Sequence, residues 1–225
     1  MTLDGQGLLV LVDPVRTSGA EAARIGRAAK AAGVRGLLIG SSFDGAAQTH
    51  EVARALRANA PGIPVALFPG SAMQLTDQVD LILFLSLVSG RNPQYLIEEH
   101  VRAVPYLQQH PVPTLSTAYI LIDGGRVTSV ESVSQTRPLP ADKPELAAAH
   151  ATAATLIGMQ AVYLDAGSGA LGAGSRCSTA RSSRRRSVSG GAGRRECSHA
   201  NTSSRVIAQD LERSPECGRE PLPIS

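Results

Sequence analysis

The stretch Ala161-Val-Tyr-Leu-Asp-Ala-Gly-Ser-Gly-Ala170 joins a short apolar run to a turn of small residues. An apolar run without polar alternation is typical of a parallel strand that is covered on both faces. Gly167, Ser168 and Gly169 can present successive N–H groups and one hydroxyl to a phosphate. An ordinary glycine-rich turn is the alternative interpretation, because such turns are common after strands. The stretch therefore predicts a strand over Ala161–Leu164 and a candidate phosphate site directly after it.

Similar apolar runs recur towards the N-terminus, and helical patterns separate them. The predicted strands are Leu8–Val12, Gly36–Ile39, Pro64–Phe68, Asp80–Leu85, Thr117–Ile122 and Ala161–Leu164. The predicted helices cover approximately residues 18–32, 47–59, 93–109 and 143–158. Repeated strand–helix units predict an α/β fold with a parallel sheet. We therefore expect a TIM-barrel-like (β/α)8 fold in which six βα units are recognisable and the last two are missing or replaced.

The composition changes abruptly after Ala170. Residues 171–225 contain 10 Arg, 11 Ser and all three cysteines, and with 4 Glu and 1 Asp they carry a formal charge of 10 − 5 = +5. The whole chain is +3, so residues 1–170 carry 3 − 5 = −2. Residues 174–204 are Ser/Arg/Gly-rich and offer little apolar surface to offset ordering entropy; Arg205–Ala208 is the one brief strand-like run. We predict a barrel domain over 1–170 and a disordered tail over 171–225.

Two origins of the tail remain open at the level of sequence. A GC-rich gene read out of frame tends to yield Arg, Ser, Gly and Ala, so a disrupted reading frame just after Ala170 is the preferred hypothesis. A genuine basic tail is the other, with Arg181-Ser-Ser-Arg-Arg-Arg186 available to anionic partners. Residues 171–225 contain no aromatic side chain on which a base could stack, so no nucleic-acid partner is expected.

Composition excludes several other classes of protein. Hydrophobic residues make up 43% of the chain, which is typical of globular proteins, and no apolar run is long enough for a membrane span. The N-terminus shows no secretory signal, so a cytoplasmic protein is expected. The three cysteines lack CxxC spacing, which argues against a zinc site or a disulfide framework.

Polar residues follow most of the predicted strands. Asp13 comes directly after the first strand, where a carboxylate can hold Mg²⁺ or cap a helix. Ser42 follows the second strand. Arg91 follows the fourth, and either meets a diphosphate or is a solvated surface side chain. Tyr119 lies within the fifth strand, where a tyrosine is more often part of the core.

Seven sequence blocks, in order, resemble the geranylgeranylglyceryl phosphate synthase family over roughly residues 5–170. They are Val12-Asp-Pro14, Ile39-Gly-Ser-Ser42, Leu67-Phe-Pro-Gly-Ser71, Leu83-Phe-Leu-Ser-Leu-Val-Ser-Gly-Arg-Asn-Pro-Gln-Tyr-Leu-Ile97, Tyr119-Ile-Leu-Ile-Asp-Gly-Gly125, Arg137-Pro-Leu-Pro-Ala-Asp-Lys-Pro-Glu145 and Tyr163 to Ala170. The resemblance implies an Mg²⁺-dependent prenyltransferase. The C3 hydroxyl of sn-glycerol 1-phosphate would displace diphosphate from geranylgeranyl diphosphate, and the resulting ether-lipid precursor would be delivered to the membrane.

The same resemblance implies roles for particular residues. Asp13 and Ser42 match the metal positions, and Asp165 matches a carboxylate near the glycerol that would accept the proton. The glycerol phosphate segment corresponds to Tyr163, Leu164, Asp165, Ala166, Gly167, Ser168 and Gly169, with Arg91 and Tyr119 as further substrate-binding candidates. A homo-oligomer is expected if the barrel is complete.

The chain departs from the family pattern at two places. The family usually reads Asp-Pro-Asp-Lys after the first strand, whereas this chain has Asp13-Pro-Val-Arg16, which removes one acidic group near the metal. The last two strands and their phosphate-binding loops are not recognisable as such. Two alternatives therefore accompany the main hypothesis: an inactive, truncated or frame-disrupted member, and a phosphate-binding barrel that uses another donor such as heptaprenyl diphosphate.

Overall fold

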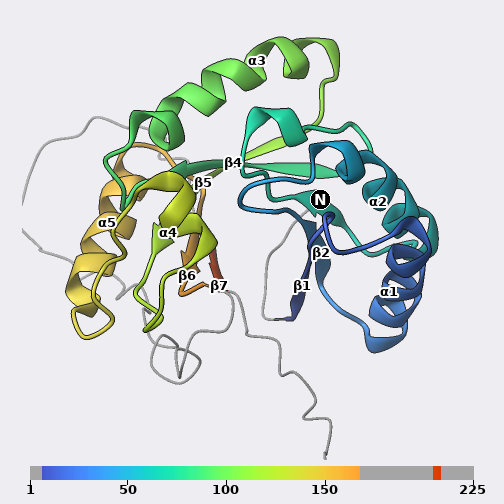
Figure 1. Cartoon of the computed structure of the whole chain (residues 1–225), viewed down its shortest axis with the longest axis horizontal. Coiled ribbons are helices and arrows are strands. Elements are labelled where there is room, and N and C mark those ends of the chain that lie inside the picture. The colour runs from blue at the N-terminus through green and yellow to red at the C-terminus, as the bar shows by residue number, and fades with distance from the viewer. Residues whose placement is uncertain (1–6, 168–204, 209–225) are drawn as a thin grey trace, which may run out of the picture.

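The protein forms one curled parallel sheet with helices on its outer side (Figure 1). The computed structural model describes residues 7–167 and the backbone of residues 205–208. Seven strands pair in chain order, and every pair is parallel. They are β1 (Leu9–Val12), β2 (Gly36–Ile39), β3 (Val65–Leu67), β4 (Leu81–Leu87), β5 (Thr114–Leu121), β6 (Ala161–Asp165) and β7 (Arg205–Ala208).

Helical segments connect the strands of this half-barrel. They are α1 (Gly19–Ala32), α2 (Ala46–Asn59), the short 3₁₀ turn η1 (Ala72–Gln74), the π-helical turn η2 (Gln94–Glu98), α3 (Glu99–Gln109), α4 (Ser129–Ser134) and α5 (Pro144–Leu156). Local chemistry explains the ends of α1. Ser18 Oγ accepts a hydrogen bond from the Glu21 N–H at 3.2 Å, and Gly33 ends the helix with φ of 65°.

Side chains alternate between the two faces of the sheet, as the pleat of a strand requires. On the inner face one cluster runs across the half-barrel and includes Leu38, Leu83, Tyr119 and Tyr163. On the outer face a second cluster packs the first strands against α1 and α2, and a third packs β5 and β6 against α5. The strands are therefore buried on both faces, which explains why they read as continuous apolar runs.

The predicted α/β class and its six βα strands are confirmed. The largest difference in a strand is at β5, which begins at Thr114 rather than at Thr117. The sequence does not predict this extension because Ser116 interrupts the apolar run. In the structure the Ser116 Oγ accepts a hydrogen bond from the Gln160 N–H at 3.2 Å, so this polar residue fits within the strand. The sequence also contains no clear signal for η1 or α4, which are only three and six residues long.

The structure adds β7 at the run that the sequence indicated as strand-like. Arg205–Ala208 pairs in parallel with Ala161–Leu164 and extends the sheet beyond β6. These four residues of the predicted tail therefore have strand backbone. The rest of the predicted tail, residues 171–204 and 209–225, lies outside the described residues, and the division of domains at Ala170 stays a prediction. Among the helices that the structure describes, none has the length and apolar character that crossing a bilayer requires.

Candidate active site

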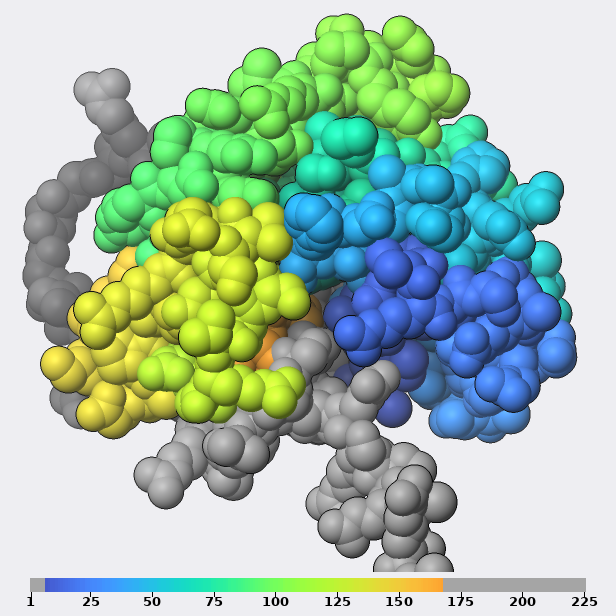
Figure 2. Space-filling model, in the orientation of Figure 1, coloured from blue at the N-terminus to red at the C-terminus, as the bar shows by residue number. Residues whose placement is uncertain are grey.

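The candidate residues come together at the carboxyl ends of the strands. Asp13 follows β1, Ser42 lies three residues beyond β2, and Asp165 is the last residue of β6. Because all the strands are parallel, these positions share one edge of the half-barrel. Figure 2 shows the N-terminal βα units and the yellow-green segment that contains α4 bordering one another across the middle of the molecule. The loops of the two halves therefore lie at the same end of the sheet.

Asp165 is the most buried carboxylate of this rim among the described residues. The residue is 8% exposed. Because side chains alternate along β6, that of Asp165 lies on the inner face of the half-barrel, as does that of Tyr163. The Tyr119 hydroxyl donates to Asp165 Oδ2, and the Gly167 N–H donates to Oδ1 at 2.7 Å. Each carboxylate oxygen thus has one fixed donor and keeps capacity for another. The arrangement holds a negative charge in place at the mouth of the barrel.

Three aromatic rings support this carboxylate from below. Phe68 packs against Tyr119 and Tyr163, with ring centroids 5.7 and 4.6 Å apart, and the two tyrosines lie 5.6 Å apart. Burial, followed by the charge of Asp165, raises the pKa of both tyrosines above the usual value. The Tyr119 hydroxyl therefore keeps its proton and remains a donor to the carboxylate.

Glycine is required at the turn after β6. Gly167 has φ of +81°, and a Cβ at this position would lie 2.2 Å from Thr128 Cγ2. Thr128 caps α4, since its Oγ1 accepts a hydrogen bond from the Glu131 N–H at 3.2 Å. The turn therefore packs directly against the start of α4. Ser168 and Gly169, the other residues of the predicted phosphate turn, lie outside the described residues.

Asp13 occupies the opposite half of the rim. Its Oδ1 accepts a hydrogen bond from the Val15 N–H at 2.9 Å, and Oδ2 lies 3.7 Å from Arg16 Nε. The loop after β1 touches the loop after β2, because a Cβ on Gly45 would lie 2.8 Å from Pro14 Cγ. The two predicted metal residues, Asp13 and Ser42, thus lie on adjoining loops.

The loops after β2 and β3 are locked together. A Cβ on Gly40 would lie 1.9 Å from Phe68 O, and a Cβ on Gly70 would lie 2.5 Å from Ser41 O. The buried Gln74 side chain joins the same loops through hydrogen bonds to both of them. The backbone around Ser42 is therefore held from two sides.

Hydrogen bonds hold the loop after β4 to its own backbone, to α4 and to β5. Arg91 Nη1 donates to Gly90 O at 2.6 Å, and the Asn92 amide donates to Ser134 O at 2.9 Å. The buried Ser89 hydroxyl accepts a hydrogen bond from the Leu121 N–H at 2.9 Å and so ties this loop to the end of β5. Arg91 is exposed at the rim, and its contact with a diphosphate stays a prediction.

The donor set on the β1 and β2 loops fits Mg²⁺ by its chemistry. Mg²⁺ commonly takes one or two carboxylates and completes its shell with water and substrate phosphates. Asp13 supplies one half-exposed carboxylate, and Ser42 supplies a hydroxyl. Among the residues that the structure describes, no group of three or more His, Cys, Asp or Glu could hold a metal alone. A metal here would therefore depend on the substrate for most of its ligands.

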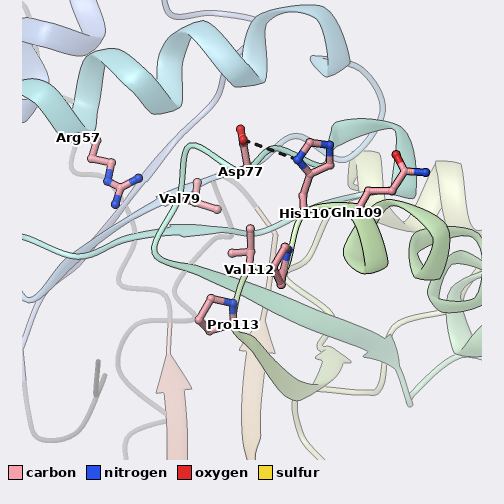
Figure 3. A pocket seen from close by; sticks show the side chains of 8 residues that line it. Arg57, Asp77, Val79, Gln109, His110, Val112 and Pro113 are labelled. Carbon is pink, nitrogen blue, oxygen red and sulfur yellow. Dashed lines mark ion pairs between the residues drawn. The ribbon is translucent and has the colours of Figure 1, made fainter.

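One pocket lies at the other end of the strands. It has a volume of about 300 Å³ and is lined by the end of α2 and the segments that precede β4 and β5 (Figure 3). Asp77 Oδ2 and His110 Nδ1 are 3.8 Å apart across it. The pocket contains none of the predicted site residues, so it has no part in the candidate site.

The fold and its rim define a parallel α/β half-barrel with a carboxylate and glycine turn in one half and a hydroxyl-bearing loop pair in the other. The chain belongs to the PcrB family, which matches residues 3–206. The predicted family resemblance is thereby confirmed. The match extends past Ala170, the last residue of the sequence blocks that resemble the family.

Relatives and solved structures agree with this assignment. The geranylgeranylglyceryl phosphate synthase of Chitinophaga pinensis is 39% identical over 161 residues, which cover 72% of this chain and 64% of that relative. That of Zunongwangia profunda is 50% identical over 109 residues, or 47% of its length. The chain therefore spans less than two thirds of these relatives.

The structural match is equally partial in extent. The chain resembles the (S)-3-O-geranylgeranylglyceryl phosphate synthase of Thermoplasma acidophilum in complex with substrate sn-glycerol-1-phosphate, with a TM-score of 0.68 and 30% identity. The match covers 74% of this chain and 66% of that one. The wild-type GGGPS from Thermoplasma volcanium gives the same TM-score at 27% identity, over 75% and 67%.

Several residues that shape the site gave no recognisable signal in the sequence. Phe68 stands out in the sequence only as part of the Leu67–Ser71 block, and Thr128 and Gln74 belong to no recognisable motif. Each acts through a partner far along the chain, such as Ser41 for Gln74, 33 residues away. A local pattern contains no trace of such a partner.

Proposed function

We propose that this chain is a prenyltransferase that joins geranylgeranyl diphosphate to the C3 hydroxyl of sn-glycerol 1-phosphate, with Mg²⁺ as cofactor. The product is an ether-lipid precursor that passes to the membrane. The names of the similar enzymes support the reaction, and the Thermoplasma acidophilum complex supports the acceptor. The observation that carries the proposal is Asp165, a buried carboxylate held by Tyr119 and Gly167 at the mouth of the barrel.

The acceptor half of the rim suits a phosphorylated alcohol. The turn at Gly167 brings backbone close to the mouth, where N–H groups can meet a phosphate. Asp165 lies beside this turn and accepts the proton of the C3 hydroxyl as the new bond forms. In the step, the bond between the prenyl C1 and the diphosphate oxygen breaks, and a bond from C1 to the glycerol oxygen forms.

The donor half of the rim, formed by the loops after β1 and β2, binds the diphosphate leaving group of the prenyl donor. When bound, Mg²⁺ neutralises the negative charge that develops on the departing diphosphate. Asp13 and Ser42 would hold it, and the interlocked loops after β2 and β3 keep Ser42 in place. Arg91, exposed on the loop after β4, would meet a diphosphate oxygen. The two halves of the rim thus bring donor and acceptor together, which lowers the entropic barrier to transfer.

Asp165→Asn tests the proton acceptor. An asparagine keeps the shape: its carbonyl oxygen can accept the hydrogen bond of the Gly167 N–H, and its NH2 group can donate to the Tyr119 oxygen. It cannot take up the proton. We expect turnover to fall by about 10²–10⁴-fold while the thermal melt stays close to that of the wild type. Asp142→Asn, on the exposed loop before α5, is the matched control and should leave turnover unchanged. Comparable turnover in the two variants would exclude Asp165 as the acceptor.

The metal half is tested separately with Asp13→Asn. Loss of the one carboxylate on the β1 loop should raise the Mg²⁺ concentration needed for half-maximal rate, with Asp142→Asn again as the control. An unchanged Mg²⁺ dependence would remove Asp13 from the metal site. Replacing the donor with heptaprenyl diphosphate in the same assay tests the alternative donor.

The second candidate is an inactive, frame-disrupted family member that makes no product, and the abrupt change of composition after Ala170 motivates it. Wild-type protein that folds and binds glycerol 1-phosphate, yet forms no ether product from either donor, would favour this alternative. DNA sequence around the codon for Ala170 decides whether a disrupted reading frame is the cause.

A further inference from the structure

Gln74 is a buried amide whose hydrogen-bonding groups are all used by two active-site loops. The side chain is on η1, after β3, and the residue is 2% exposed. Its Nε2 donates to Ser41 O at 3.0 Å and to Asp44 O at 2.7 Å, while its Oε1 accepts from the Gly70 N–H at 2.7 Å. Both amide protons are therefore used by the loop after β2, and the oxygen is used by the loop after β3.

The two carbonyls that Gln74 binds lie on either side of Ser42. Ser41 O precedes it by one residue and Asp44 O follows it by two, so the amide spans the segment that presents the Ser42 hydroxyl. The next residue, Gly45, packs against Pro14 of the loop that carries Asp13. The contacts of Gln74 are thus linked, through the backbone of the two loops, to both of the residues proposed to hold the metal.

The acceptor half of the rim has its own supports. Asp165 is held by Tyr119 and Gly167, and Gly167 packs against Thr128 at the start of α4. None of the hydrogen bonds of Gln74 reaches these residues. Phe68, which follows β3, links the two sides through its ring contacts with Tyr119 and Tyr163. A change at Gln74 should therefore be felt mainly on the donor side of the site.

We infer that Gln74 is a positioning residue that fixes the Ser41–Asp44 loop for a metal-bound diphosphate. The inference rests on the proposed function, because it takes the β1 and β2 loops as the donor site. Gln74 touches neither substrate; it acts through the loop backbone. Its loss should weaken diphosphate binding selectively, whereas a merely structural amide would affect both substrates or neither.

The test uses the full chain and two ligands measured by calorimetry: inorganic pyrophosphate with saturating Mg²⁺, and glycerol 1-phosphate. Gln74→Met removes all three hydrogen bonds while keeping a side chain of similar length. We expect about a ten-fold or greater loss of pyrophosphate affinity, since small displacements of positioned groups are costly, and unchanged glycerol 1-phosphate affinity. Gln108→Met, at an exposed position of α3, is the matched control.

Gln74→Glu gives a second, independent measurement if the methionine variant unfolds. The glutamate keeps the acceptor for Gly70 N–H but sets a carboxylate oxygen against the carbonyls of Ser41 and Asp44. Burial beside these carbonyls favours the protonated acid, which restores one donor. The ratio of wild-type to variant pyrophosphate affinity should therefore be largest at high pH and should narrow as the pH falls.

Four results would overturn the inference. They are equal losses for both ligands, no loss for pyrophosphate, wild-type protein that does not bind pyrophosphate with Mg²⁺, and unfolding of both variants, which would make Gln74 a folding residue. The proposed function fails differently, through the absence of ether product from wild-type protein. Pyrophosphate binding and product formation are separate measurements, so the two failures are distinguishable.

Discussion

Tyr119→Phe removes a single oxygen from the centre of the candidate site. Tyr119 is 7% exposed, and its hydroxyl donates to Asp165 Oδ2, which belongs to a residue that is itself only 8% exposed. A hydrogen bond to a charged group contributes about 1.5–3 kcal/mol. The phenylalanine ring retains the contacts with Phe68 and Tyr163. The free energy of unfolding should therefore fall by about this amount, with no cavity contribution.

The same change should slow the reaction, because Asp165 would keep only the Gly167 N–H to orient it. If the full contribution of the bond is expressed in the transition state, turnover falls by roughly 10- to 150-fold. Urea unfolding gives the stability, and steady-state product formation with both substrates gives the rate. Tyr106→Phe, on α3, is the control because Tyr106 packs against His110 and lies away from Asp165. A Tyr119→Phe protein with wild-type stability and turnover would refute the reasoning.

Two further predictions concern stability. Burial raises the pKa of Tyr119 and Tyr163 above the usual 10.0. As the pH rises, the unfolded chain therefore loses these protons before the folded protein does. The contribution of the two tyrosines to the free energy of unfolding is present below about pH 10 and is lost as the pH rises further. In urea unfolding above about pH 10, Tyr119→Phe should reduce the slope of this loss by about 1.4 kcal/mol per pH unit, and an unchanged slope would contradict the assignment. Gly40→Ala places a Cβ 1.9 Å from Phe68 O, a backbone atom, so overpacking should lower the unfolding free energy by about 1–3 kcal/mol or more. Gly19→Ala, where the added Cβ meets only the end of a flexible side chain, should be nearly neutral, and equal thermal melts for the two variants would argue against the close approach of the strands.

Much of the architecture could be predicted because burial on both faces leaves a local mark. The run Gly36–Ile39 is buried at every position, and the sequence shows it as four residues without a charge. The sequence predicts a β5 strand that begins too late, because Ser116 is polar and its hydrogen-bond partner Gln160 lies 44 residues away. Boundaries were therefore missed where a distant hydrogen bond satisfies a polar group within a strand.

The candidate site could be predicted in its position but not in its contacts. Asp13, Ser42 and Asp165 follow or end strands, and parallel pairing places such residues on one edge. The sequence offered no means to see that Tyr119 donates to Asp165, 46 residues away, or that Gln74 holds the Ser41–Asp44 loop. Sequence blocks therefore located the rim, whereas the supporting residues became visible only in the structure.

The sequence by itself determined the parallel α/β class, the order of the strands and the residues that lie at their carboxyl ends. These features depend on period, apolar content and turn residues, all of which are local along the chain. Only the tertiary structure decided that Gly40 and Gly70 let two loops touch, and that Asp165 receives hydrogen bonds from both a buried tyrosine and its own turn. Such contacts depend on strand register and on the curvature of the sheet, which arise when distant segments pack together.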